Sequence, residues 1–251
     1  NLFQNGAATL SGLVEMYHER VRRGEIPAAP EGEETTFIMV TGDGGMDIGM
    51  GAALGTANRN HKMIILEYDN QGYMNTGSQL SYATPYGHRT STSEVGNKLS
   101  GKRFHHKDTP QIFAACNLPY VFTASEGYPE DFMRKISKAQ WYARREGFVY
   151  GKVLSFCPLN WRTKDDAAQE VLQTAIDCCF FPLYEVERGS THITYDPDAI
   201  GRRRSVGAWL GQMGKTKHML EPDNAERLEM LEHEFDKRWR KLKIKSEHPE
   251  L

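Results

Sequence analysis

Short apolar runs alternate along the chain with segments whose apolar side chains recur every three or four positions. Residues 36–40 and 63–66 are compact apolar runs that predict buried strands, and the small-residue segment between them, about 46–58, predicts a helix. A strand, a helix and a strand within roughly 30 residues form a βαβ unit, whose parallel strands are joined by a right-handed crossover. An earlier helix over residues 10–21 is expected to end at Gly24.

The alternation continues in the middle of the chain. We expect a helix over residues 110–115, a strand over 120–123, a helix that begins near Pro129 and a strand over 148–154. Regular alternation of this kind predicts the α/β class, with an open, mostly parallel sheet that carries helices on both faces.

The C-terminal part follows another pattern. Residues 183–187 and 192–195 flank Arg188-Gly189 and predict a β-hairpin. A helical stripe follows, with apolar residues at steps of 3, 4, 4 and 3: Leu228, Leu231, Phe235, Trp239 and Leu242. We therefore expect a main domain over residues 1–180 and a C-terminal extension over 181–251, a hairpin and helix arm that packs on the domain or on a partner subunit.

Composition excludes several classes of protein. The 251 residues carry 31 Lys+Arg against 33 Asp+Glu, a formal net charge of −2 that does not favour nucleic-acid binding. No apolar run approaches the roughly 20 residues that span a membrane, and the start has no signal-peptide pattern. It also lacks Met, so we expect the native N-terminus to be missing. Four cysteines without a CxxC pair indicate reduced thiols and a cytoplasmic protein.

Two segments follow predicted parallel strands and should meet at the carboxyl edge of the sheet, where α/β folds bind ligands. The first is Gly42-Asp43-Gly44-Gly45, where glycines allow close backbone approach and the next helix directs free N–H groups at an anion. A carboxylate beside a diphosphate requires a hard cation between them, and Mg²⁺ prefers such oxygen ligands. Asn70, 27 positions after Asp43, can add an amide oxygen.

Taken alone, residues 42–45 are also compatible with a tight turn whose Asp caps the next helix. The position of Asn70 on the loop after the second strand favours the metal site instead.

At this point the chain resembles a known family. Gly42-Asp43-Gly44 followed by Asn70 is the pattern of thiamine-diphosphate enzymes, and residues 73–85 resemble the YxNTGGQxSxxTP run of pyruvate:ferredoxin oxidoreductases and related 2-oxoacid:acceptor oxidoreductases. Ser78 replaces the second glycine of that run, which suggests a locally altered backbone. Further stretches of the family are matched by residues 1–6, 154–158 and 181–185.

The resemblance implies a role for each matching residue. It implies that Asp43, Asn70 and the Gly72 carbonyl coordinate Mg²⁺, and that Asn75 lies near the reacting carbon of the cofactor as a catalytic residue. The residues implied to bind the cofactor or to line its site are Gly42, Asp43, Gly44, Gly45, Asn70, Gly72, Tyr73, Thr76, Gly77 and Gln79. For Asn75 and Gln79, a role as turn residues that satisfy backbone groups remains the alternative.

The implied activity is that of the β-type subunit of a 2-oxoacid oxidoreductase. Such an enzyme decarboxylates pyruvate or a related, possibly aromatic, 2-oxoacid oxidatively to acyl-CoA and CO₂, and passes electrons to ferredoxin or another acceptor. Subunits of α, γ and δ type are the implied partners, since a glutamate that activates thiamine is expected on another chain. The alternatives are a non-oxidative thiamine-diphosphate decarboxylase or lyase, and a cofactor-binding regulatory domain.

Cys157 is the candidate ligand of an iron–sulfur cluster. One-electron transfer needs a cluster close to the cofactor, and clusters are held by cysteine thiolates. By resemblance, Cys157 binds a 4Fe–4S cluster whose other ligands lie outside this chain segment. A small buried core residue is the alternative for any single cysteine, and it is the preferred interpretation for Cys116, Cys178 and Cys179.

Three further groups of residues are less specific. His105-His106, among charged neighbours, is interpreted as a surface loop rather than a metal site. Arg202-Arg203-Arg204 is interpreted as a solvated or salt-bridged stretch rather than a contact to coenzyme A phosphates. His88 and Arg89 follow the signature loop, but nothing in the pattern assigns them to the substrate.

Overall fold

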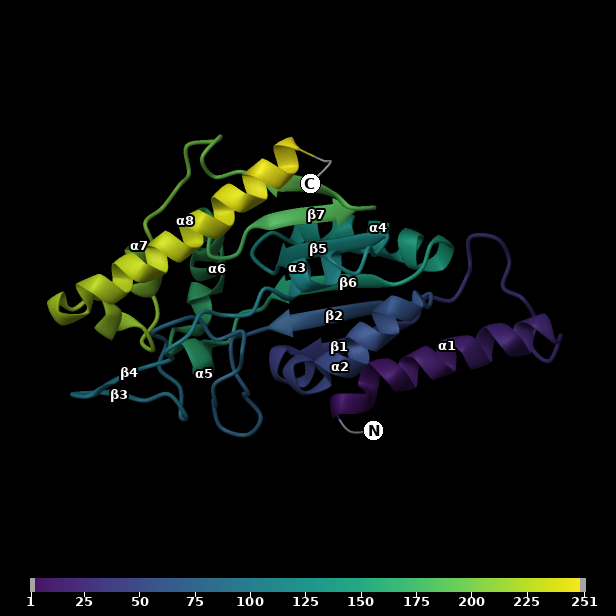
Figure 1. Cartoon of the computed structure of the whole chain (residues 1–251), viewed down its shortest axis with the longest axis horizontal. Helices are drawn as coiled ribbons and strands as arrows, with labels where there is room; N and C mark the ends of the chain where they lie inside the picture. Colours follow the sequence, from purple (N-terminus) through teal and green to yellow (C-terminus); the bar gives the residue numbers. More distant parts are fainter. Residues whose placement is uncertain (1–2, 249–251) are drawn as a thin grey trace.

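The computed structural model describes residues 3–248, so Asn1 and Leu2 of the matching segment 1–6 lie outside the described residues. Its main sheet has six strands in the order β1-β2-β6-β5-β7-β8 (Figure 1). The strands are β1 (Ile38–Gly42), β2 (Ile64–Asp69), β5 (Tyr120–Ser125), β6 (Val149–Leu154), β7 (Leu183–Glu187) and β8 (Ser190–Tyr195). The first four in this order are parallel, and β7 and β8 are antiparallel. A separate small ribbon joins β3 (Val95–Gly96) to β4 (Leu99–Ser100).

Eight α-helices surround the sheet within the described chain. They are α1 (Gly6–Arg22), α2 (Asp43–Arg59), α3 (Thr109–Ala114), α4 (Pro129–Arg145), α5 (Pro158–Trp161), α6 (Ala168–Asp177), α7 (Val206–Leu210) and α8 (Ala225–Glu247). Short 3-10 turns cover Phe3–Asn5, Asp165–Ala167, Lys217–Leu220 and Pro222–Asn224. In none of the helices of residues 3–248 do length and hydropathy together suffice to cross a bilayer.

Three apolar clusters hold these layers together. One face of the sheet packs on α1, α2, α3 and α8, and the opposite face packs on α4. The third cluster lies beyond the carboxyl ends of the parallel strands, where Trp161, Trp209 and Phe235 pack between α5, α7 and α8. Figure 1 shows α8 running obliquely in front of the sheet and the helices α5 to α7 gathered at that end.

The observed sheet confirms the predicted fold class, an open and mostly parallel α/β sheet with helices on both faces. The strands β1 and β2 pair in parallel on either side of α2, as the βαβ prediction requires. The predicted boundaries were wrong near the first glycines: β1 ends at Gly42 and α2 begins directly at Asp43, without a loop. Glycine lowers helix propensity, so the sequence pattern placed the helix start three residues too late.

The C-terminal hairpin belongs to the same sheet. Strand β7 pairs with β5 over Tyr120↔Glu187 to Phe122↔Glu185, and β8 pairs with β7. Helix α8 packs along β8, and its Trp239 and Leu242 enter the main core. The predicted hairpin is therefore confirmed, while the division of the chain at residue 180 stays a prediction.

The packing of α3 predicts that the stability of the fold depends on Phe113. Phe113 is fully buried and stacks on Tyr150 with ring centroids 4.1 Å apart. Phe113→Ala should lower the free energy of unfolding by about 3–5 kcal/mol, because it removes this contact and leaves a cavity. Its neighbour Ile112 is 39% exposed, so Ile112→Ala should change stability by only about 0.5 kcal/mol. Urea unfolding of both variants measures the difference, and equal losses would contradict this packing.

Candidate functional site

Three neighbouring parallel strands end side by side and bring the candidate segments together. In the register of the sheet, Gly42 of β1 is level with Tyr68 of β2, and Asp69 of β2 is level with Leu154 of β6. The backbone N–H of Ser155 donates to the Asp69 carbonyl over 3.0 Å, which continues the pairing beyond the strands. The segments that carry Asp43, Asn70 and Cys157 therefore leave the sheet at the same edge.

The N-terminus of α2 is open to a ligand. Gly42 is its N-cap residue, is exposed, and supplies no side chain to cap the first N–H groups of the helix. A Cβ on Gly42 would meet nothing within 4 Å. A Cβ on Gly44 would lie 1.8 Å from the ring of Tyr73, so this glycine is required because the loop after β2 packs directly on the first turn of α2. The free N–H groups and the positive end of the helix dipole favour an anion at this position.

Asp43 is buried without an ion-pair partner among the residues that the structure describes. Its side chain is 1% exposed, and its Oδ2 atom has no hydrogen-bond partner within the described chain. Burial, reinforced by the neighbouring carboxylate of Asp69, raises the pKa of Asp43 to about 7. A carboxyl group in this environment gains the most from a bound cation, because a cation stabilises its charged form.

Asn70 is held by its backbone, which leaves its side-chain oxygen free. Its main-chain carbonyl accepts hydrogen bonds from Asn160 Nδ2 at 2.7 Å and from Trp161 Nε1 at 2.9 Å. Its Oδ1 atom is buried and unpaired within the described residues. Asn160 also approaches Gly72, where a Cβ would lie 3.1 Å from Nδ2. Helix α5 thus fixes the loop after β2, and the side-chain oxygen of Asn70 in that loop remains without a hydrogen-bond donor.

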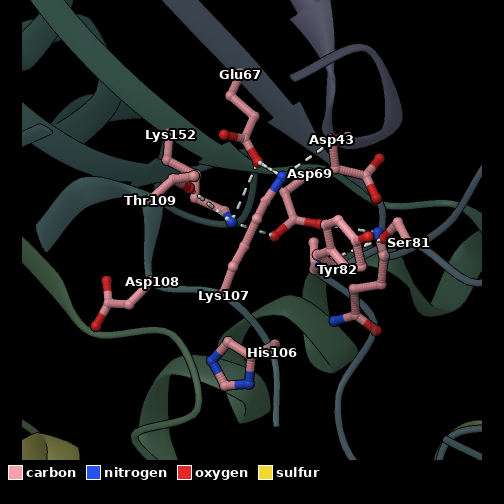
Figure 2. Close-up of polar contacts among 12 residues, drawn as sticks. Asp43, Glu67, Asp69, Ser81, Tyr82, His106, Lys107, Asp108, Thr109 and Lys152 are labelled. Atoms are coloured by element: carbon pink, nitrogen blue, oxygen red, sulfur yellow. Dashed lines mark hydrogen bonds and ion pairs between the residues drawn. The ribbon is translucent and has the colours of Figure 1, made fainter. Parts of the chain in front are cut away.

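A network of ion pairs lies behind this edge, as Figure 2 shows. Lys152 lies 3.2 Å from Glu67 and 3.0 Å from Asp69, and Lys107 pairs with Asp47. Burial alone would lower the pKa of Lys152, but Asp69 and Glu67 outweigh it and hold that pKa above its usual value. Lys107 donates to the main-chain carbonyl of Asp43 at 3.1 Å, so the network supports the first turn of α2 without neutralising the Asp43 carboxylate.

The signature loop is closed at its base and exposed at its tip. Tyr73 and Gln79 exchange two backbone hydrogen bonds of 3.0 and 3.2 Å. Thr76 Oγ1 donates to Gln79 Oε1 at 2.6 Å, and Gln79 Nε2 donates to the Thr76 carbonyl, so Gln79 does satisfy backbone and side-chain groups of the turn. Asn75, Thr76 and Gly77 are exposed. Asn75 therefore lies at the protein surface and is not hydrogen-bonded to Asp43 or Asn70 among residues 3–248.

Ser78 explains how the loop tolerates its departure from the family pattern. Its φ of 60° lies in the left-handed region that favours glycine. The hydroxyl group lies 3.2 Å from Met74 Sδ and 3.4 Å from Asn160 Oδ1. The serine thus lies in a left-handed backbone conformation that favours glycine, with side-chain contacts that hold it there.

Cys157 is placed beside the Asn70 loop. It is partly exposed and is the N-cap residue of α5, where its Sγ accepts from the Asn160 N–H at 3.5 Å. The carboxylate of Glu126 accepts from Ser155 Oγ and from the Phe156 N–H, both at 2.9 Å, and so fixes the segment that precedes the cysteine. Asn160 therefore contacts both candidate ligand residues, Asn70 and Cys157.

The interpretation of the segment around His105-His106 as a surface loop was wrong in part. Lys102 is 1% exposed, and its Nζ donates to the carbonyls of Ser81 and Tyr82 at 3.2 Å. His106 packs on Phe180 and accepts from Arg238 Nη1 at 2.7 Å. Lysines are buried here because backbone carbonyls and carboxylates replace the water that their ammonium groups would otherwise bind. Lys102 and Lys107 were not identified from the sequence, because a local run of charges normally marks a solvated face. Lys152 was not identified because its carboxylate partners lie on a distant strand.

The remaining candidates fall outside the site. Cys178 and Cys179 are buried core residues, as predicted, and Cys116 is partly buried against the main core.

In the arginine run, Arg203 pairs with Asp236 and Arg204 lies 3.7 Å from Asp177, as expected of a salt-bridged stretch. His88 is fully buried against Trp209, and Arg89 pairs with Glu94 at 2.7 Å.

The oxygen atoms at this edge suit a hard divalent cation. Asp43 Oδ2 and Asn70 Oδ1 are both buried and unpaired, and an uncapped helix N-terminus lies beside them. Residues 3–248 contain no group of three or more His, Cys, Asp or Glu side chains that could hold a metal without further ligands. Mg²⁺ matches this incomplete set, since it takes one or two protein oxygens together with phosphate oxygens and water.

Comparison with known proteins agrees with this geometry. Residues 25–151 match the family described as thiamine pyrophosphate enzyme, C-terminal TPP binding domain, where thiamine pyrophosphate is another name for thiamine diphosphate. The chain belongs to this family. The match covers both loops, whereas Cys157 and the C-terminal hairpin lie beyond it.

Individual relatives extend the likeness of this thiamine-diphosphate-binding chain over nearly its full length. It is 38% identical to the pyruvate synthase subunit PorB of Thermotoga maritima over 244 residues, 96% of this chain and 72% of the relative. It is 32% identical to the ketoisovalerate oxidoreductase subunit VorB of Pyrococcus horikoshii, over 97% of this chain and 76% of the relative. A solved 2-oxoglutarate:ferredoxin oxidoreductase of Magnetococcus marinus is 22% identical with a TM-score of 0.49, over 68% of this chain and 58% of that chain.

The buried carboxyl group predicts a pH-dependent stability of the metal-free protein. The pKa of Asp43 is about 7 in the folded chain and near 3.8 when unfolded, so the folded state keeps a proton that the unfolded state releases. The free energy of unfolding should therefore fall as pH rises from about 4 to 7, by roughly 1.4 kcal/mol per pKa unit. Asp43→Asn should remove this slope and be the more stable protein at pH 8. Denaturant unfolding in a chelator at several pH values measures it, and parallel curves for the two proteins would contradict the raised pKa.

Proposed function

We propose that this chain is the thiamine-diphosphate-binding, β-type subunit of a 2-oxoacid oxidoreductase. The complex would convert a 2-oxoacid such as pyruvate, with coenzyme A, into acyl-CoA and CO₂, and pass electrons through an iron–sulfur cluster to ferredoxin or another acceptor. The names of the PorB and VorB relatives support this class of enzyme. The four cysteines form no disulfide within the described chain, which is consistent with a cytoplasmic protein.

One observation carries the cofactor part of the proposal: two buried oxygens, Asp43 Oδ2 and Asn70 Oδ1, come from adjacent strand ends and lack partners within residues 3–248. Buried polar atoms are normally paired, and an unpaired one costs roughly 1–3 kcal/mol. Two such atoms beside an open helix N-terminus are accounted for together by a bound Mg²⁺ and a diphosphate. Either feature alone would carry less weight.

The chain's own residues act by positioning and charge. Asp43 Oδ2, Asn70 Oδ1 and the Gly72 carbonyl would hold Mg²⁺, while the N–H groups of Gly44 and Gly45 would receive the diphosphate. When bound, thiamine diphosphate supplies the carbon nucleophile that decarboxylates 2-oxoacids. Because Asn160 and Trp161 already fix the Asn70 backbone, the ligand oxygens need little rearrangement to bind a cation.

The exposed signature loop supports an active site that is shared with another subunit. Asn75, Thr76 and Gly77 form an exposed tip, whereas a wall close to a reacting carbon must exclude water. Exposed apolar side chains also lie on the edge strand β1 and on α2: Val40 is 63% exposed and Ile48 is 50% exposed. We propose that a partner subunit of α, γ or δ type covers this surface, brings Asn75 against the substrate and supplies the glutamate that activates thiamine.

Calorimetry tests the cofactor site directly on this chain. Thiamine diphosphate should bind only with Mg²⁺ present, and Asp43→Ala and Asn70→Ala should each weaken binding roughly tenfold or more. Asn160→Ala should weaken it less, because the Asn70 side chain remains. The matched control is Asn97→Ala, an exposed residue in the turn between β3 and β4, which should bind like the unmodified chain. Unchanged affinity in Asn70→Ala, with the fold intact, would remove this residue from the metal site.

Cys157 is proposed as the ligand that this chain contributes to a 4Fe–4S cluster. Its position at the same edge as Asn70 suits electron transfer from the cofactor, and the remaining ligands would come from outside residues 3–248. In the reconstituted complex, Cys157→Ala should abolish the iron–sulfur EPR signal and dye reduction by 2-oxoacid plus coenzyme A. Cys116→Ala, which replaces another partly exposed cysteine, should leave both unchanged. A full cluster signal in Cys157→Ala would refute the assignment.

A further inference from the structure

A cleft separate from the open N-terminus of α2 lies between α8, α3 and the sheet. Its volume is about 400 Å³, within the range of small-molecule sites. Its inner end is formed by Asp69 and Lys152, and its outer end by residues of α8 and by Gln111 of α3. In Figure 1, α8 runs obliquely on the side of the sheet that ends in β8, above α3 in this view. The cleft therefore runs from the surface to the back of the ion-pair network.

The walls of the cleft are mainly apolar. Phe180, Phe181 and Pro182, just before β7, line it together with Pro110 of α3 and Leu242 of α8. Aromatic and aliphatic walls of this kind favour an apolar or aromatic ligand body, because contact with them removes apolar surface from water.

The outer end is lined by lysines that the protein does not neutralise. Lys237, Lys241 and Lys245 follow each other at intervals of four residues, so they lie on one face of α8. Lys241 is exposed and has no ion-pair partner among the described residues. Lys245 donates to the neutral amide of Gln111 at 2.7 Å, and Lys237 is 3.7 Å from Glu234, which Arg238 already pairs at 2.8 Å. The surplus of positive charge favours an anion.

One hydrogen-bond donor in the wall lacks an acceptor. His106 lines the cleft, and its Nε2 lies 2.7 Å from Nη1 of Arg238, which can only donate. Burial keeps the pKa of His106 well below its usual value, so the ring is neutral and its proton is on Nδ1. This Nδ1 is buried without a partner within residues 3–248. Because it is buried, this atom is closed to a ligand in the cleft, so recognition rests on the apolar walls and the lysines.

From these contacts we propose that the cleft binds an amphipathic organic anion, with an aromatic or branched apolar body between Phe181 and Leu242 and its acidic group at Lys241. The apolar walls select the body and the lysine face selects the charge. The proposed site consists only of residues of this chain and uses neither thiamine diphosphate nor the iron–sulfur cluster, whereas the comparison with the assembled complex rests on the proposed function. A segment of a partner subunit is the competing occupant, and the test distinguishes it.

The test uses the full chain, without added cofactor, and two fluorescent probes of similar shape. The anion 1-anilinonaphthalene-8-sulfonate should bind at one site per chain, and the uncharged N-phenyl-1-naphthylamine should bind roughly tenfold more weakly. Lys241→Glu should weaken binding of the anion by about tenfold or more, and added salt should weaken it in the unmodified chain. Arg240→Glu is the matched control. It makes the same charge change on the residue of α8 that precedes Lys241, and Arg240 is exposed and does not line the cleft.

Three results would overturn the proposal. Equal affinity for both probes would show an apolar surface without charge recognition, and equal losses in Lys241→Glu and Arg240→Glu would show a general field effect. Binding to the isolated chain that disappears in the assembled complex would assign the cleft to a partner segment. Binding that persists in the complex and remains sensitive to Lys241→Glu, but not to Arg240→Glu, would support a small-molecule site.

Discussion

The buried carboxylate of Asp43 is the constraint on which the rest of this edge depends. A carboxylate at 1% exposure, next to the second carboxylate of Asp69, is costly when it is charged. Around it, Lys107 and Lys152 form ion pairs with Asp47, Glu67 and Asp69, but no lysine or arginine of residues 3–248 pairs with Asp43. In this fold the Asp43 side chain is therefore stable either as the neutral, protonated acid or as a carboxylate that binds a metal ion.

The surrounding contacts keep the ligand oxygens in place before anything binds. The ring of Tyr73 on Gly44 joins the loop after β2 to the first turn of α2. Asn160 and Trp161 hold the Asn70 backbone from α5, which begins at Cys157. The ends of β1, β2 and β6 are therefore tied together by Tyr73 from the loop after β2 and by Asn160 and Trp161 from α5. Such support reduces the rearrangement that binding requires, which is the physical advantage of building a site on a rigid sheet edge.

The sequence predicts how the strand ends are arranged at this edge of the sheet. It does not predict which side chains are buried behind the edge. Alternating apolar runs identify parallel strands, so they also predict that the residues after Gly42, Asp69 and Leu154 meet. Local patterns do not identify Asn160, because its contact with Asn70 joins positions 90 residues apart. They misplace the start of α2, since glycine near Asp43 looks like a loop. They also miss the buried role of Lys107, because whether a lysine is solvated or paired inside depends on carboxylates from distant strands.

The central claim, a divalent cation between the loops after β1 and β2, is tested most directly by crystallography with Mn²⁺ in place of Mg²⁺. The protein would be crystallised with Mn²⁺ and thiamine diphosphate, and the metal located by its anomalous scattering. The account predicts one peak within coordination distance of Asp43 Oδ2 and Asn70 Oδ1, next to the diphosphate at the start of α2. A bound cofactor whose metal lies elsewhere, or crystals with no metal peak between these two oxygens, would contradict it.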